Sequence, residues 1–223
     1  MKSLRFFVIA SIVVLIDQIV KVIVKLNMSL GQEITVLGDW FKIHFIENKG
    51  AAFGITLSSL FQWVLSWGNN QTSTHSEEAD KLVLAVFSIL AIFGIAWWMI
   101  LAAKNTPQLA TVIALILGGA TGNLIDRIFY GRWFERINDY EGGLFNGNVV
   151  DMLYFDVWSG IMPDWIPFIG GRFYALLPVF NLADLAITSA ILIIFIFYPK
   201  LIQPTTKISA DNPIQTNNNQ IPT

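Results

Sequence analysis

The sequence predicts a polytopic α-helical membrane protein with four spans. Hydrophobic residues make up 54% of the 223 residues and charged residues only 13%, about half the charge of a typical soluble domain. The mean hydropathy is +0.58, and the 8 Trp and 17 Phe are of the kinds enriched at membrane interfaces. About 20 apolar residues cross a bilayer as a helix. Four segments meet this length: 6–24, 82–103, 109–129 and 178–198.

The first apolar run follows Lys2 and Arg5, as the core of a signal peptide would. The run is longer than such a core, contains Asp17 and Lys21, and has no small-x-small cleavage site. We therefore interpret 6–24 as a membrane span.

The other three spans have clear limits. Segment 82–103 contains no charged residue. The third helix is expected to start with Thr106 as N-cap and Pro107 at the first helical position. The fourth is expected to stop at Pro199. We treat 1–202 as a single membrane-embedded domain, and 203–223, rich in Pro and Asn, as a disordered cytoplasmic tail.

Four spans place both termini on the same side of the membrane. Basic residues near the span ends lie on that side, while long loops count little in the positive-inside rule. These basic residues are Lys2, Arg5, Lys104, Lys200 and Lys207. We expect cytoplasmic termini, with the loops of about 26–80 and 130–177 facing outward.

Polar residues inside three of the spans fall at one depth once the alternating helix directions are followed. They are Asp17, Lys21, Asn123, Asp126, Arg127, Asn181 and Asp184. Asp17 and Lys21 are four residues apart, and Asn181 and Asp184 three. Asp126 and Arg127 follow Asn123 by three and four residues, so each set is expected on one side of its helix. Because charged groups in hydrocarbon cost several kcal/mol, we expect one buried polar cluster near the outer interface. Structural alternatives remain: Asp17 and Lys21 form only an ion pair, or Asn123 and Asn181 only join helices.

The outer segments contain β-like and interfacial pieces. "EITVL" and "FKIHFI", separated by Gly38 and Asp39, predict a hairpin that leads toward Asn48. The following residues predict a short amphipathic segment lying on the membrane surface. The second loop, rich in aromatic and charged residues, is expected at the interface as well.

The available residue types restrict the chemistry. The chain has no Cys and only 2 His, so thiol catalysis is excluded and a zinc site is not expected. Two carboxyl groups a few Å apart in a low-dielectric site share one proton, and such a pair can activate water and protonate a leaving amide. This aspartic-protease chemistry requires no cofactor. The net charge of −2 does not indicate nucleic acid as a partner.

Five motifs, found in order along the spans, resemble those of bacterial lipoprotein signal peptidase, the type II signal peptidase. They are "DQIVK" (17–21), "ENKGAAFG" (47–54), "GGATGNLIDRIFYG" (118–131), "NVVDM" (148–152) and "FNLADLAI" (180–187). The resemblance implies four membrane helices with a small periplasmic β-cradle and a short periplasmic amphipathic helix. It implies an intramembrane aspartic endopeptidase of the bacterial inner membrane, with its active site at the periplasmic face. The substrate would be a prolipoprotein cleaved before a cysteine that carries a diacylglyceryl group, with membrane lipid around it.

The same resemblance implies roles for single residues. Catalytic roles fall on Asp151 and Asp184; substrate-binding roles on Asn48, Asn123, Arg127 and Asn181; supporting roles on Asp17, Lys21 and Asp126, the last paired near Arg127. The chain departs from the family in two inserted stretches, 132–148 and 158–175, the former interpreted as an expanded lid. Asp126 is therefore kept as the rival partner of Asp184.

Two other classes of function fit a buried polar cluster. A proton-coupled transporter or channel would also bury Asp and Arg. The polar groups, however, cluster at one side of the membrane and leave no polar path inward, and the second span contributes none. A non-enzymatic scaffold would leave the clustered acids without a use.

Overall fold

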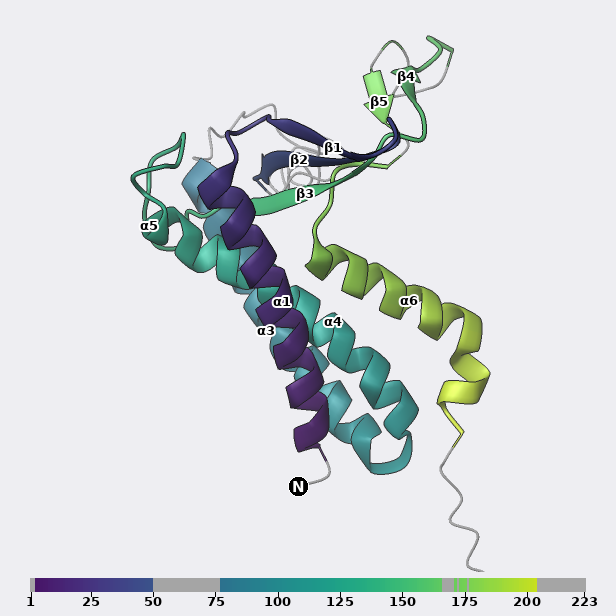
Figure 1. The fold of residues 1–223 in the computed structure, drawn as a ribbon. Helices are drawn as coiled ribbons and strands as arrows, with labels where there is room; N and C mark the ends of the chain where they lie inside the picture. Colours follow the sequence, from purple (N-terminus) through teal and green to yellow (C-terminus); the bar gives the residue numbers. More distant parts are fainter. Residues whose placement is uncertain (1–2, 50–76, 166–170, 172, 176, 204–223) are drawn as a thin grey trace, which may run out of the picture.

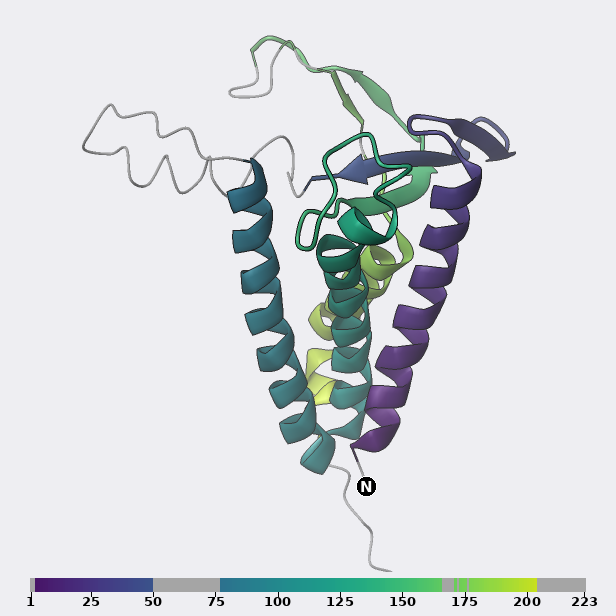
Figure 2. The same ribbon diagram turned by 90° about the vertical axis from the view of Figure 1, so that its left-hand side faces the viewer.

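The computed structural model describes residues 3–49, 77–165, 171, 173–175 and 177–203. Four helices run side by side and carry a small sheet at one end (Figures 1 and 2). All four are long and apolar enough to cross a membrane. The predicted polytopic α-helical fold is therefore confirmed, whereas most of the predicted amphipathic segment and of the tail lie outside the described residues.

The membrane helices are α1 (Leu4–Asn27), α3 (Glu77–Asn105), α4 (Pro107–Ile125) and α6 (Leu182–Leu201). Helix α4 lies between the other three and contacts each of them. It continues through a π-helical turn, η1 (Asp126–Tyr130), into a last short helix, α5 (Gly131–Trp133). Inserted π-helical turns are frequent at functional sites.

Small residues allow this central position of α4. A Cβ added to Gly118 would lie 2.7 Å from the carbonyl oxygen of Ala10 in α1, and one added to Gly119 would lie 2.4 Å from that of Ala183 in α6. Both distances are too short for a methyl group, so the glycines permit close packing of α4 on two neighbours at once.

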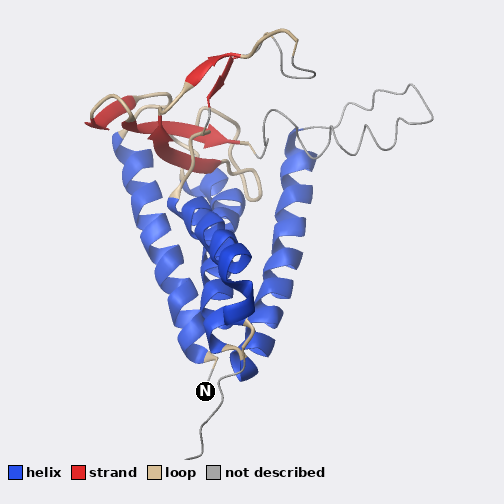
Figure 3. Ribbon diagram, turned by 90° about the vertical axis from the view of Figure 1, so that its right-hand side faces the viewer, coloured by secondary structure: helices blue, strands red, loops and turns tan. Residues whose placement is uncertain are grey.

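The sheet is antiparallel, in the order β1–β2–β3, and Figure 3 shows its strands, in red, at one end of the helices. Strands β1 (Glu33–Leu37) and β2 (Phe41–Asn48) form the predicted hairpin. Strand β3 (Val149–Phe155) pairs with β2, whereas the sequence predicts only an interfacial loop for these residues. A separate two-stranded ribbon, β4 (Ser159–Ile161) and β5 (Phe173–Ala175), lies within the inserted stretch 158–175.

Two expectations about the fourth span are corrected. Helix α6 begins at Leu182 rather than at 178, because Asn181 caps it and Phe180 still pairs through its backbone with Leu153 of β3. It also runs past Pro199 and ends at Leu201.

Two apolar clusters stabilise the fold. One fills the space between the helices and includes Phe6, Met99 and Ile113. The other lies beneath the sheet, where Val24, Phe45 and Tyr130 meet the even-numbered residues Val150 and Met152 of β3. Since successive side chains of a strand point to opposite faces, Asp151 is directed away from this second cluster.

Candidate active site

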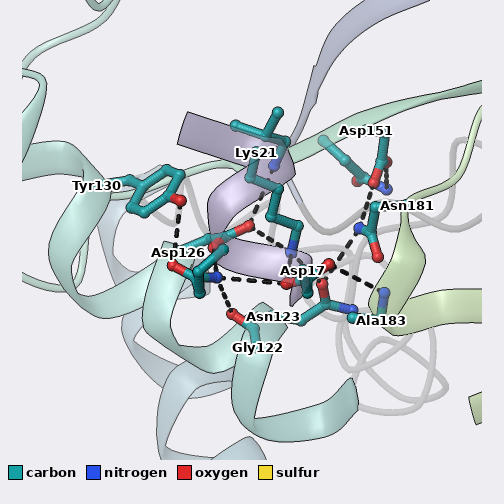
Figure 4. Close-up of polar contacts among 12 residues, drawn as sticks. Asp17, Lys21, Gly122, Asn123, Asp126, Tyr130, Asp151, Asn181 and Ala183 are labelled. Carbon is teal, nitrogen blue, oxygen red and sulfur yellow. Dashed lines mark hydrogen bonds and ion pairs between the residues drawn. The ribbon is translucent and has the colours of Figure 1, made fainter. Parts of the chain in front are cut away.

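The ammonium group of Lys21 lies at the centre of the predicted polar cluster (Figure 4). Its Nζ is 2.9 Å from Asp17 Oδ2, 2.8 Å from Asp126 Oδ2 and donates to Asn123 Oδ1 at 2.8 Å. Lys21, Asp17 and Asp126 are each 0% exposed. The three N–H donors of the Lys21 ammonium group thus meet three acceptors, as a buried ammonium requires.

The predicted pairing of Asp126 with Arg127 is wrong. Asp126 pairs instead with Lys21, and its Oδ1 accepts a hydrogen bond of 2.8 Å from Gln18. Its Oδ2 also accepts from the backbone N–H of Val150 at 3.3 Å. Neighbouring residues on a helix point in different directions, so Arg127 cannot follow Asp126 toward α1. Asp126 therefore joins α1, α4 and β3.

The first turn of α6 explains how Asp184 is accommodated at the start of a membrane helix. Asn181 Oδ1 accepts the N–H of Asp184 at 2.9 Å, and Asp184 Oδ2 accepts the N–H of Asn181 at 3.4 Å. This is a reciprocal capping box. Asp17 of α1 accepts the next free donor, the N–H of Ala183, at 2.9 Å. The carboxylates thus lie where the partial positive charge of the helix end favours them.

Asp151 reaches the same region from β3. Its Oδ1 accepts a hydrogen bond of 2.6 Å from the side chain of Asn181, and its Oδ2 accepts one of 3.2 Å from Asn48. The residue is 1% exposed. Burial, followed by the negative charge of Asp184, raises the pKa of Asp151 to about 7, although the two amide donors act in the opposite direction.

Asp151 and Asp184 are held by the same amides. Asn181 donates to Asp151 through its side chain and to Asp184 through its backbone, and Asn123 Nδ2 donates to Asp184 Oδ1 at 2.8 Å. Asn181 also donates to Asn123 at 3.1 Å. Within the described part of the chain neither carboxylate forms an ion pair, in contrast to Asp17 and Asp126, which share Lys21. Two such carboxyl groups can together hold one proton.

The sequence-predicted residues therefore gather in one place. Arg127 is partly buried and close enough to Asp126, Asp151 and Asp184 for their charges to interact, but its guanidinium forms no hydrogen bond with a described residue. Over the described ranges, no group of three or more acidic or histidine side chains could hold a metal ion.

Sequence reasoning missed two members of the cluster. Gln18 donates to Asp126, and its Oε1 accepts from the Tyr130 hydroxyl at 3.1 Å. Both residues lie inside motifs, "DQIVK" and "RIFYG", but uncharged side chains gave no energetic reason to single them out.

The sequence and fold of this chain are similar to those of known proteins. A family model described as signal peptidase (SPase) II matches residues 9–199. A protein of Amoebophilus asiaticus named "Lipoprotein signal peptidase" is 37% identical over 94% of this chain and 84% of its own length. One of Porphyromonas gingivalis with the same name is 37% identical over 87% of this chain and 84% of its own length. A solved structure described as a bacterial membrane enzyme shares the fold, with a TM-score of 0.52 at 21% identity over 95% of this chain and 94% of that one. The chain belongs to the signal peptidase II family and is a membrane-embedded peptidase.

Proposed function

We propose that Asp151 and Asp184 are the catalytic pair of this peptidase, and that it removes the signal peptide from prolipoproteins by cleaving before a diacylglyceryl-modified cysteine. One observation carries the assignment of the pair. They are the acids of the cluster that share Asn181 as a donor and lie outside the Lys21 ion pairs.

The reaction follows from a pair that holds one proton. The raised pKa of Asp151 favours its protonated form near neutral pH, which leaves Asp184 as the base. Asp184 removes a proton from water as the water oxygen bonds to the scissile carbonyl carbon, and Asp151 gives its proton to the carbonyl oxygen. These transfers produce a tetrahedral gem-diol intermediate. When its C–N bond breaks, the amide nitrogen takes the proton from Asp184, and one hydroxyl of the gem-diol returns a proton to Asp151.

The surrounding amides suit two tasks. Asn181 and Asn123 hold the carboxyl groups in place, because their donors already contact them. Arg127, without a hydrogen-bond partner among the described residues, is available to bind backbone carbonyl groups of the substrate. Asn48, at the end of β2, donates to Asp151 and lies where an extended substrate segment would pass beside the sheet.

The position of the pair supports a lipidated substrate. Asp184 lies in the first turn of a membrane helix, and Asp151 lies in the sheet that covers the same end of the bundle (Figure 1). A peptide bond next to a lipid-anchored cysteine would be held at this boundary by its acyl chains. We place this end at the periplasmic face of the bacterial inner membrane, with both termini in the cytoplasm.

The test is cleavage of a synthetic signal peptide in lipid vesicles. The wild-type protein should release the fragment that precedes a diacylglyceryl-modified cysteine and leave the unmodified peptide intact. Asp151→Asn and Asp184→Asn should each lower the rate at least about a hundredfold, with circular dichroism unchanged.

Asp126→Asn distinguishes the rival pair. If cleavage vanishes in this variant but survives in Asp151→Asn, the assignment is overturned. A transporter or scaffold would cleave neither peptide.

A further inference from the structure

Strand β2 carries a one-residue β-bulge next to the candidate pair. Ile43 lies opposite Leu153 and Ile46 opposite Asp151, so two residues of β2, His44 and Phe45, face one residue of β3. Side chains alternate between the faces of a strand, so an extra residue reverses the face of every residue that follows it. Bulges next to active sites commonly redirect a side chain in this way.

The reversal decides which side chain meets Asp151. In the bulged register Asn48 shares a face with Asp151 and donates to it at 3.2 Å. Glu47 points to the opposite face, where Asn148 donates to it at 3.2 Å. In a continuous register Glu47 would take the face of Asp151 and place another carboxylate beside it, and Asn48 would point away.

Two kinds of contact hold the bulged register. The backbone of Phe45 turns away from β3: its N–H donates to Gln32 at 3.0 Å and its carbonyl accepts from Gly31 at 2.8 Å. The Phe45 side chain is buried in the apolar cluster beneath the sheet. Beyond the bulge, Glu47 Oε1 forms an ion pair with Lys25 of α1, while Oε2 accepts from Asn148.

The contacts of Glu47 are buried and selective. The side chain of Glu47 is 8% exposed and that of Lys25 is 2% exposed. Asn148 turns its Nδ2 toward Glu47 although its own Oδ1 is left without a hydrogen-bond partner in the described part of the chain. Leaving a buried acceptor unsatisfied is unfavourable, so the hydrogen bond to the Glu47 carboxylate accounts for this orientation of the amide.

We propose that Glu47 is a positioning residue, which holds β2 in the bulged register so that Asn48 reaches Asp151. Its two oxygens tie this end of β2 to α1, through Lys25, and to Asn148, three residues before Asp151. The proposal rests on the proposed function, since it gives Glu47 a role only if Asp151 is catalytic.

The test compares Glu47→Gln with Glu33→Gln in the full-length protein, measured as kcat/KM on the lipidated peptide. Glu33 lies in the same sheet but is 44% exposed and pairs with Lys42, away from the candidate pair. Glu47→Gln should lower kcat/KM about tenfold and Glu33→Gln less than twofold. Because Glu47 acts through Asn48, adding Glu47→Gln to Asn48→Ala should cost less than twofold more.

The coupling separates positioning from general stability. If Glu47→Gln lowers kcat/KM by the same factor with and without Asn48→Ala, or only in proportion to the folded fraction, the proposal is overturned. If Glu47→Gln has no effect while Asp151→Asn is inactive, the positioning role fails and the proposed function stands. If Asp151→Asn cleaves like wild type, the proposed function fails, and the role of Glu47 with it.

Discussion

Replacing Asp151 by asparagine should remove a pH-dependent loss of stability as well as abolish cleavage. Burial, followed by the charge of Asp184, raises the pKa of Asp151 from 3.8 to about 7 in the folded protein. A raised carboxyl pKa contributes stability that is fully present below the unfolded value and is lost as pH rises through the folded value. At about 1.4 kcal/mol per pH unit, this amounts to a loss of roughly 4 kcal/mol between pH 4 and pH 7.

The side chain of the Asp151→Asn variant cannot ionise, so the variant should gain about this much stability relative to wild type as pH rises from 4 to 8. For a chain of this length, the gain corresponds to a rise in Tm on the order of 10 °C. The new asparagine also carries an N–H donor, which would face the N–H donor of Asn48 or Asn181 that now contacts Asp151. This contact is unfavourable, but it lowers stability by the same amount at every pH. The change with pH is therefore the quantity to measure.

The assay is thermal unfolding in detergent micelles at closely spaced pH values, with the exposed carboxylate variant Asp139→Asn as control. The Tm difference between Asp151→Asn and wild type should widen from pH 4 to pH 7 and then level off. A difference that stays constant across this window would refute the raised pKa, and with it the assignment of Asp151 as the protonated member of the pair.

Three further results are expected. Lys21→Met leaves two buried carboxylates without their cation and should destabilise the fold by about 3–5 kcal/mol, measured as a lower Tm; a wild-type Tm would contradict the pairing. Gly147→Ala should also lower Tm, since a Cβ there would lie 1.9 Å from the carbonyl oxygen of Asp126, whereas Gly94→Ala, with nothing within 4 Å, should not; equal effects would contradict this packing. Activity should be bell-shaped in pH, falling above about 7 as Asp151 loses its proton and falling in acid as the pair gains a second one, and EDTA should leave it unchanged. Inhibition by EDTA would indicate a metal.

The membrane helices and the first hairpin could be predicted because their signals are local. Apolar length alone marks the spans, and Gly38 and Asp39 separate two runs that do pair as β1 and β2. The common depth of the polar residues followed from helix direction, and the contacts of Lys21 with Asp126 and Asn123 confirm that they meet.

The features that sequence reasoning missed depend on contacts distant in the chain. Strand β3 forms by pairing with β2, which ends about a hundred residues earlier in the chain. The Val, Tyr and Phe residues of "NVVDMLYF" favour a strand, but the local sequence does not indicate its partner. Likewise the start of α6 depends on Asn181 and on Asp17 of another helix. The bulge in β2 has no local signal, since neither His44 nor Phe45 is a typical bulge residue.

The ion pairs of Lys21 also bear on the order in which the chain enters the membrane. In α1, Asp17 and Lys21 neutralise each other within one turn, so the apolar span 6–24 can cross the bilayer without net charge. Among the described residues, Asp126 forms its ion pair with Lys21 of α1, and the third span is therefore costly to insert until the first is already in place. Because synthesis starts at the N-terminus, α1 is made before the third span. The Asp126 carboxylate, which alone would oppose insertion, thus favours packing of its helix against α1.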